Sequence, residues 1–163
     1  MIITLLRKLR NSITRLIGLL ALLNFVLRKI FFGFENACNY LKKVSSSSLL
    51  LVLKNQGAKI GHNTDIGAGI SFHNCKDFSN FEVGSNTHIG KNSFFDLREK
   101  VIISNNVVIS MNCSFITHVD ASKSKVSKVI PAEARSIIIC KDAYIGEGCS
   151  ILMGVTIGEG SII

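Results

Sequence analysis

With 163 residues, the chain is long enough for one domain and an appendage. Its formal net charge of +8 is unevenly placed, because residues 1–43 hold eight basic residues and one acidic residue, Glu35. The rest of the chain is nearly neutral and has no basic strand interleaved with aromatic residues, zinc finger or recognition-helix motif. These features exclude a nucleic-acid-binding protein.

Residues 1–44 are predicted to form a basic amphipathic helical segment. Its polar residues recur at helical spacing and make one stripe: Thr4, Arg7, Lys8, Asn11, Thr14, Arg15 and Gly18. The apolar run from Leu16 to Leu27 is shorter than the roughly 20 residues that span a bilayer. We expect residues 1–34 to lie on an anionic membrane surface. Packing against the rest of the protein or its other copies is the alternative.

A second, shorter helix is expected within residues 45–59. The serines Ser45–Ser48 make a polar break that can cap the apolar run LLLVLKN, and Gly57 ends it. Such a helix can cover the first strand edges of the domain that follows, which are prone to aggregation when bare.

From residue 60 to 163 the sequence repeats every six residues. Blocks such as IGHNTD, IGAGIS, VGSNTH, IGKNSF, IGEGCS and IGEGSI begin with an aliphatic residue, most often followed by glycine. The first residue of a block is predicted to point into a core, and glycine or asparagine suits the corners. Three blocks make a triangular coil of about 18 residues, so the pattern predicts a parallel β-helix. An ordinary sandwich of short strands does not require this spacing.

The repeat slips twice, between Phe78 and Val83 and near Val101, and we interpret both slips as corner adjustments. It stops over residues 117–138, which contain the chain's one proline. An interruption of a repeat array usually forms a loop on the binding face. This loop is therefore the first place to expect chemistry.

The five cysteines are odd in number and form no C-x-x-C pair. Cys113 and Cys149 fall at the small inward position of their blocks, where a thiol acts as a compact apolar group. We interpret all five as reduced, which fits a cytoplasmic protein.

Residues 57–163 resemble the hexapeptide-repeat acyltransferases, which include bacterial polysaccharide O-acetyltransferases and maltose and galactoside acetyltransferases. The similarity rests on THVD at Thr117–Asp120, followed after the loop by IGEGCSILMGVTIG at Ile145–Gly158. Tyr144 stands where this family usually has tryptophan, and Cys140 where it has glycine. The resemblance implies a mainly β fold whose coil is left-handed, against the usual crossover rule.

The resemblance implies acetyl transfer from acetyl-CoA to a sugar hydroxyl. His118 is the expected general base, because imidazole titrates close to neutral pH. Asp120 is the candidate group that orients the imidazole, and Asn92 is the candidate oxyanion donor. Asp96, Arg98 and Thr117 are expected to bind the acceptor, with a corner ion pair as the alternative for Asp96 and Arg98; the residues expected to bind CoA are Gly146, Glu147 and Gly154.

The implied partners are acetyl-CoA as co-substrate, a sugar or glycan acceptor, and two further copies in a homotrimer with sites between protomers. The segment Asp96-Leu97-Arg98 and the following VIISNNVVIS are similar to members that acetylate bacterial surface polysaccharides. We therefore expect a role in capsule, O-antigen or exopolysaccharide synthesis, peripheral on the inner face of the cytoplasmic membrane.

Two alternatives remain at this stage. A zinc enzyme on the same fold, like the γ-type carbonic anhydrases, needs a second histidine five residues after His118, where this chain has Lys123, so no metal is expected. The second is a catalytically inactive, C-terminally truncated scaffold that associates with membranes. It is suggested by the apolar N-terminus and by an end at Ile163, inside a coil.

Overall fold

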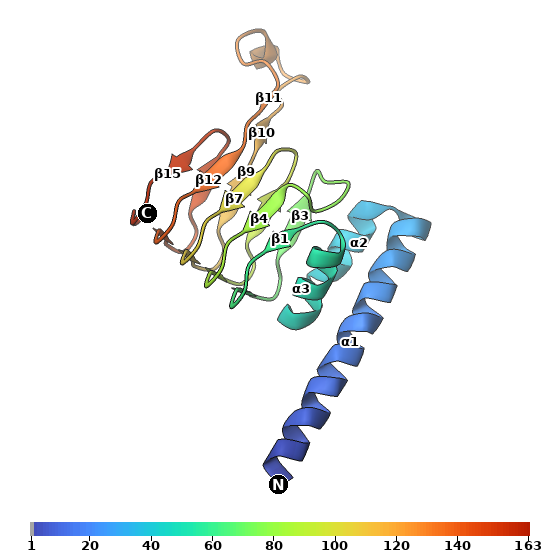
Figure 1. Ribbon diagram of the computed structural model, residues 1–163. Coiled ribbons are helices and arrows are strands. Elements are labelled where there is room, and N and C mark those ends of the chain that lie inside the picture. Colours follow the sequence, from blue (N-terminus) through green and yellow to red (C-terminus); the bar gives the residue numbers. More distant parts are fainter. Residues whose placement is uncertain (1) are drawn as a thin grey trace.

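The computed structural model describes residues 2–163 and places three helices ahead of a stack of short strands (Figure 1). The helices are α1 (Ile2–Phe32), α2 (Phe34–Leu41) and α3 (Ser46–Asn55). Gly33 separates α1 from α2 with a positive φ of 83°, a conformation that costs glycine little. The side chain of Ser45 accepts a hydrogen bond from the backbone N–H of Ser48 and caps α3.

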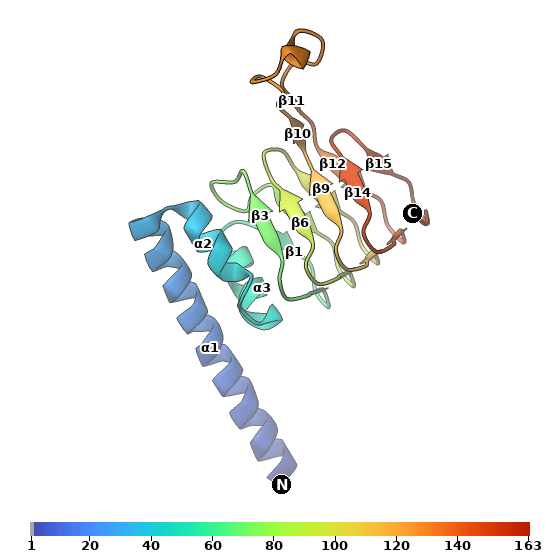
Figure 2. The same ribbon diagram turned by 180° about the vertical axis from the view of Figure 1, so that it is seen from behind.

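The strands form three parallel sheets around a common core (Figure 2). The first sheet has the order β1 (Lys59–Ile60), β4 (Phe81–Val83), β7 (Val101–Ile103), β12 (Ile137–Ile139) and β15 (Thr156–Ile157). The second has the order β13 (Tyr144–Ile145), β8 (Val108–Ile109), β5 (His88–Ile89) and β2 (Asp65–Ile66). The third has the order β14 (Ser150–Leu152), β9 (Ser114–Ile116), β6 (Phe94–Asp96) and β3 (Ser71–His73). The chain passes from sheet to sheet in turn, which confirms the predicted parallel β-helix.

Equivalent side chains stack in the core from one coil to the next. The Phe72, Phe95 and Phe115 rings form one such column in the third sheet, with ring centroids 5.9 and 4.8 Å apart. Most of the residues predicted to point inward are buried: Ile66, Val83, Ile89, Ile103, Ile109, Ile139, Ile145, Ile151 and Ile157. Ile60, in the first coil, is half-buried.

The coils differ in length at their corners. Ile139 pairs with Ile157, 18 residues on, but Ile60 pairs with Val83 and Val83 with Ile103, which are 23 and 20 residues on. The predicted length of about 18 residues is therefore wrong for the first two coils, because extra residues lie at the corners that follow β3 and β6. Asparagines hold many of the corners in the left-handed region: Asn63, Asn74, Asn86, Asn92, Asn106 and Asn112.

A hairpin interrupts the third coil and projects from the stack (Figure 2). Its strands β10 (His118–Val119) and β11 (Glu133–Ala134) are antiparallel, and a 3₁₀ turn at Lys125–Lys128 lies between them. The insertion lengthens this coil to 36 residues between Phe115 and Ile151. β12 already begins at Ile137, so the insertion is shorter than the predicted loop 117–138.

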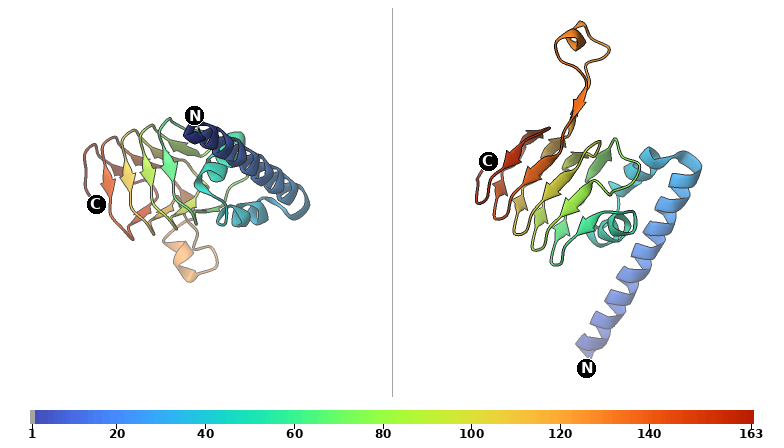
Figure 3. Two further views of the ribbon diagram at one scale, coloured as in Figure 1. Left: turned by 90° about the horizontal axis from the view of Figure 1, so that it is seen from below. Right: turned by 45° about the horizontal axis from the view of Figure 1, so that its top comes forward.

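The helices cover the open end of the first coil (Figure 3). α3 packs on β1 and β2, α2 packs on β3, and α1 packs on both α2 and α3. Phe25 of α1, Phe34 of α2 and Phe78 of the first long corner meet edge to face, which ties the helices to the stack. Among residues 2–163, no helix is both long and apolar enough to cross a membrane.

The tight stacking of corners generates the first prediction. A Cβ added at Gly90 would lie 2.5 Å from the backbone nitrogen of Met111 in the next coil, and backbone cannot move aside cheaply. We expect Gly90→Ala to lower the free energy of unfolding by about 2–4 kcal/mol in a denaturant titration.

Gly158→Ala is the matched control. Gly158 holds the same place in its block, but its nearest neighbour to an added Cβ is the Ser161 hydroxyl at 3.5 Å. We expect a change within about 0.5 kcal/mol. Equal losses in the two variants would contradict the stacking argument.

Candidate functional site

The strands of the third sheet all end at one corner, and two chemical groups from successive coils meet there. Asp96 is the last residue of β6, and His118 follows β9 after Thr117. The Phe95 and Phe115 rings stack with an interplanar angle of 3°, so the coils that carry Asp96 and His118 are held in register. The two residues are 22 positions apart in sequence and adjacent in space.

The Asp96 and His118 side chains form a short hydrogen bond. Nδ1 of His118 lies 2.6 Å from Oδ2 of Asp96. The Asp96 side chain is 1% exposed and the His118 side chain 20% exposed. The carboxylate is thus shielded from water, while the imidazole remains accessible from one side.

Further donors satisfy the buried carboxylate. Oδ2 of Asp96 also accepts from the backbone N–H and the hydroxyl of Thr117, at 2.9 and 2.8 Å. Oδ1 accepts from the Asn74 side-chain amide at 2.8 Å. Burial raises the pKa of Asp96, but the hydrogen bonds from His118, Asn74 and Thr117 outweigh burial and hold its pKa below the ordinary value.

An ionised carboxylate sets the tautomer of the imidazole. A carboxylate without a proton can only accept, so Nδ1 of His118 carries the hydrogen. In the neutral ring Nε2 is then the acceptor, with its lone pair directed away from Asp96. The pair therefore presents one basic nitrogen to whatever molecule approaches the exposed side of the ring.

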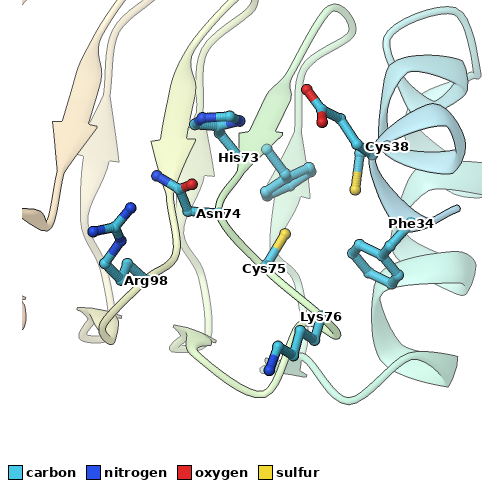
Figure 4. Close-up of a pocket in the computed structure, with 9 residues that line it drawn as sticks. Phe34, Cys38, His73, Asn74, Cys75, Lys76 and Arg98 are labelled. Atoms are coloured by element: carbon cyan, nitrogen blue, oxygen red, sulfur yellow. The ribbon is translucent and has the colours of Figure 1, made fainter.

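A cavity of about 320 Å³ opens beside this corner, between α2 and the end of β3 (Figure 4). Its apolar walls are the rings of Phe34 and Phe72, and its polar walls include His73, Asn74 and Arg98. Asn74 is shared with the Asp96–His118 pair, since its amide binds Asp96. The cavity and the pair thus form one continuous site.

Two thiols also face the cavity. Cys38 of α2 and Cys75 of the corner line it, and their sulfur atoms are drawn in Figure 4. The hydrogen bond with Cys75 and burial both raise the pKa of Cys38, so this thiol stays protonated. All five cysteines of the chain are free.

Three solved structures resemble this chain. A hexapeptide-repeat-containing acetyltransferase from Vibrio cholerae aligns with a TM-score of 0.65 and 20% identity, over 78% of this chain and 74% of that one. Its structure complexed with acetyl coenzyme A, from V. cholerae O1 biovar eltor, gives 0.61 and 19%, over 82% and 76%. A maltose O-acetyltransferase from Clostridium difficile 630 gives 0.56 and 19%, over 79% and 74%. This chain has the hexapeptide-repeat acetyltransferase fold.

The sequence itself matches no family model, and the search of curated proteins finds no match either. The likeness to the acetyltransferase structures therefore lies in the coil and not in long stretches of shared sequence. Among residues 2–163, no group of three or more histidine, cysteine, aspartate or glutamate side chains is placed to hold a metal ion.

The acetyltransferase fold assigns the orienting role to a different aspartate from the one predicted. Asp120 accepts a hydrogen bond from the backbone N–H of Ser122 at 3.0 Å, and this bond lowers the pKa of Asp120. Asp96, which was predicted to bind the acceptor, is the residue bonded to His118. The predicted ion pair between Asp96 and Arg98 is not among the salt bridges of the described residues.

The other predicted residues divide between two corners. Gly154 follows β14 on the His118 side of the third sheet, where the Arg135 side chain lies over it. Asn92, Gly146 and Glu147 precede β6 and β14, at the opposite end of these strands. Within one chain, the structure does not bring these three residues to the Asp96–His118 pair, and their roles stay predictions.

Sequence reasoning missed Asn74 altogether. Asn74 lies 22 residues before Asp96, and its φ of 54° at the corner after β3 aims its amide at the carboxylate of the next coil. Asn63 and Asn86 have the same corner conformation without such a role, so the residue type alone is no signal. The Asp96–His118 spacing becomes informative once the 20-residue coil between β6 and β9 is known.

The buried carboxylate generates the second prediction. We expect Asp96→Asn to lower the free energy of unfolding at pH 7 by about 2 kcal/mol, because the amide cannot accept at both positions. The folded-state pKa of Asp96 is below its ordinary value of about 3.9, so its stabilisation is present above that pH. It is lost as the pH falls through the lower folded-state value, so the difference between wild type and variant should shrink below about pH 4.

Asp65→Asn is the matched control for this measurement. Asp65 Oδ2 lies 2.7 Å from Nδ1 of His88, but the Asp65 side chain is 67% exposed. We expect a loss within about 0.5 kcal/mol. A wild-type advantage over Asp96→Asn that is undiminished at pH 3 would show that the carboxylate charge is not what stabilises the corner.

Proposed function

We propose that this protein transfers an acetyl group from acetyl-CoA to the hydroxyl of a sugar. The observation that carries the proposal is the Asp96–His118 pair, placed at a corner of an acetyltransferase fold beside a cavity. One of the similar structures is a complex with acetyl coenzyme A, and another is a maltose O-acetyltransferase. The scaffold alternative is not favoured, because the pair is fully assembled and hydrogen-bonded.

In the proposed reaction, Nε2 of His118 takes the proton of the acceptor hydroxyl as its oxygen attacks the thioester carbonyl carbon. The new C–O bond gives a tetrahedral intermediate, which collapses as the C–S bond breaks. His118 then returns the proton to the departing sulfur, so the products are an acetyl ester and free CoA. Asp96 keeps the ring in the required tautomer and stabilises the imidazolium formed between the two steps.

The cavity supports a sugar as the acceptor. The Phe34 and Phe72 rings offer apolar surface, and Asn74 and Arg98 offer hydrogen-bond donors on the walls around them. A sugar ring has both apolar C–H faces and polar hydroxyls, so it fits this mixture. The similarity of the Asp96–Arg98 segment to polysaccharide-modifying members leads us to include a unit of a bacterial surface polysaccharide as the acceptor.

The proposal includes a left-handed coil and a homotrimer whose sites lie between protomers. The two corners of the third sheet provide a reason for the trimer. His118 lies at one end of these strands, while Asn92, Gly146 and Glu147 lie at the other. An oxyanion donor or a CoA contact from this second group requires a neighbouring protomer to bring it to His118.

The third prediction tests the general base. His118→Ala is expected to lower kcat for acetyl transfer about a thousandfold, because no other group replaces the basic nitrogen. The measurement is release of the CoA thiol from acetyl-CoA in the presence of a panel of sugars and lipid-linked oligosaccharides. Asp96→Asn should give a smaller loss and an altered pH profile.

His88→Ala is the matched control, since His88 also pairs with an aspartate but lies in the second sheet. We expect His88→Ala to keep wild-type kcat. Transfer that persists at the wild-type rate in His118→Ala would overturn the proposed function, provided that circular dichroism shows the variant folded.

The fourth prediction tests the cavity. Arg98→Ala is expected to raise KM for the acceptor about tenfold and to leave KM for acetyl-CoA unchanged, because Arg98 lines only the acceptor side in this assignment. Lys141→Ala, which removes a surface cation paired with Glu159, is the control and should change neither constant. An effect of Arg98→Ala on KM for acetyl-CoA alone would place the CoA, not the sugar, in this cavity.

A further inference from the structure

Helix α1 is long, and only its second half contacts the rest of the protein. Its 31 residues span about 46 Å at 1.5 Å per residue. The buried residues of α1 are Gly18, Ala21 and Phe25, and every residue from Ile2 to Ile17 is exposed. The first half accordingly extends beyond the coil stack (Figures 1 and 3).

The packed face of α1 is narrow and defined by Gly18. A Cβ at this position would lie 3.1 Å from Cδ2 of Leu51, so α1 and α3 are in close contact there. Phe25 lies two turns further along the same face and is fully buried. At 100° per residue, Thr4 and Asn11 lie on this face too, so the polar stripe of the first half faces the side on which the protein body lies.

The opposite face of α1 is apolar from end to end and has no partner within the described residues. Its residues lie about 140–220° around the helix from Gly18. They are between 45% and 58% exposed: Leu9, Ile13, Leu16, Leu20, Leu23 and Leu27. We call these six residues the outer stripe. A continuous apolar surface of this length is unusual on a water-exposed helix.

The charges of α1 indicate what covers the outer stripe. Residues 1–34 contain no acidic residue, and Lys8, Arg10 and Arg15 lie about 100–120° from the middle of the stripe, along its two sides. Long cationic side chains in this position reach the anionic headgroups while their stems cover apolar surface. Two copies of α1 packed through their stripes would instead bring like charges together without an acidic partner.

We infer that α1 lies flat in the surface of an anionic lipid bilayer. The outer stripe enters the boundary between headgroups and acyl chains, and the flanking cations bind lipid phosphates. Because the packed face is opposite to the stripe, the coil stack stands on the aqueous side of the bilayer. The inference uses no feature of the Asp96–His118 site and stands independently of the proposed function.

The fifth prediction is a sedimentation experiment with the full chain and lipid vesicles. The protein should sediment with vesicles of phosphatidylcholine containing about 30% phosphatidylglycerol, and much less with phosphatidylcholine alone. Binding should weaken in about 1 M salt, where surface charges are screened. The triple variant Leu9→Ser, Ile13→Ser, Leu16→Ser should lower the partition coefficient more than about a hundredfold, because three apolar side chains no longer enter the bilayer.

Two variants provide the controls. Val126→Ser, Val129→Ser and Ile130→Ser together remove three exposed apolar side chains from the projecting hairpin, and this variant should bind vesicles as wild type does. Arg7→Gln, Arg10→Gln and Arg15→Gln together keep the outer stripe but should abolish the preference for anionic vesicles. None of these positions is buried, so thermal unfolding should remain cooperative in all three variants.

Three outcomes would overturn the inference. One is a wild-type protein that binds neither kind of vesicle, and another is an outer-stripe variant that binds as tightly as wild type. The third is a stripe variant whose only change is a lower oligomeric mass in analytical ultracentrifugation. This result would assign the stripe to a second copy of the chain instead of a membrane.

Discussion

The stacking of identical faces, coil upon coil, is the constraint on which the rest of this structure depends. Each core position holds a side chain of similar shape above the one before it, as in the Phe72, Phe95 and Phe115 column. Parallel backbone hydrogen bonds fix the spacing, and the aromatic and aliphatic columns fix the register. Corner residues of successive coils are therefore neighbours, although about 20 residues separate them in sequence.

This neighbourhood explains how a carboxylate can be buried at the site. An isolated buried charge is costly, but Asp96 receives hydrogen bonds from Asn74 in the coil before it and from Thr117 and His118 in the coil after it. The three coils together replace the water that the carboxylate loses. The exposed Asp65–His88 pair, which has similar geometry, lacks this enclosure and shows that a short contact alone does not make a site.

The helices give the molecule two functionally different ends. α2 and α3 close the first coil and complete one wall of the cavity through Phe34 and Cys38. α1 buries one narrow face against them and leaves the opposite face to its surroundings. If α1 binds a lipid surface, as we infer, the body is held at the membrane by its first coil, and an acceptor attached to the same membrane can reach the cavity without free diffusion.

The sequence by itself determined the coil and its core, because inward positions six residues apart can be buried together only in such a stack. It also determined a helical N-terminus and singled out His118, which stands at the point where the repeat stops. Only the tertiary structure decided that Asp96, and not Asp120, holds the imidazole. The choice depends on corner lengths that set which residues of successive coils meet, and short polar corners carry no periodic signal from which those lengths can be read. The outward direction of the apolar stripe was decided by tertiary packing as well, because only the contact of Gly18 with α3 shows which side of α1 faces the body.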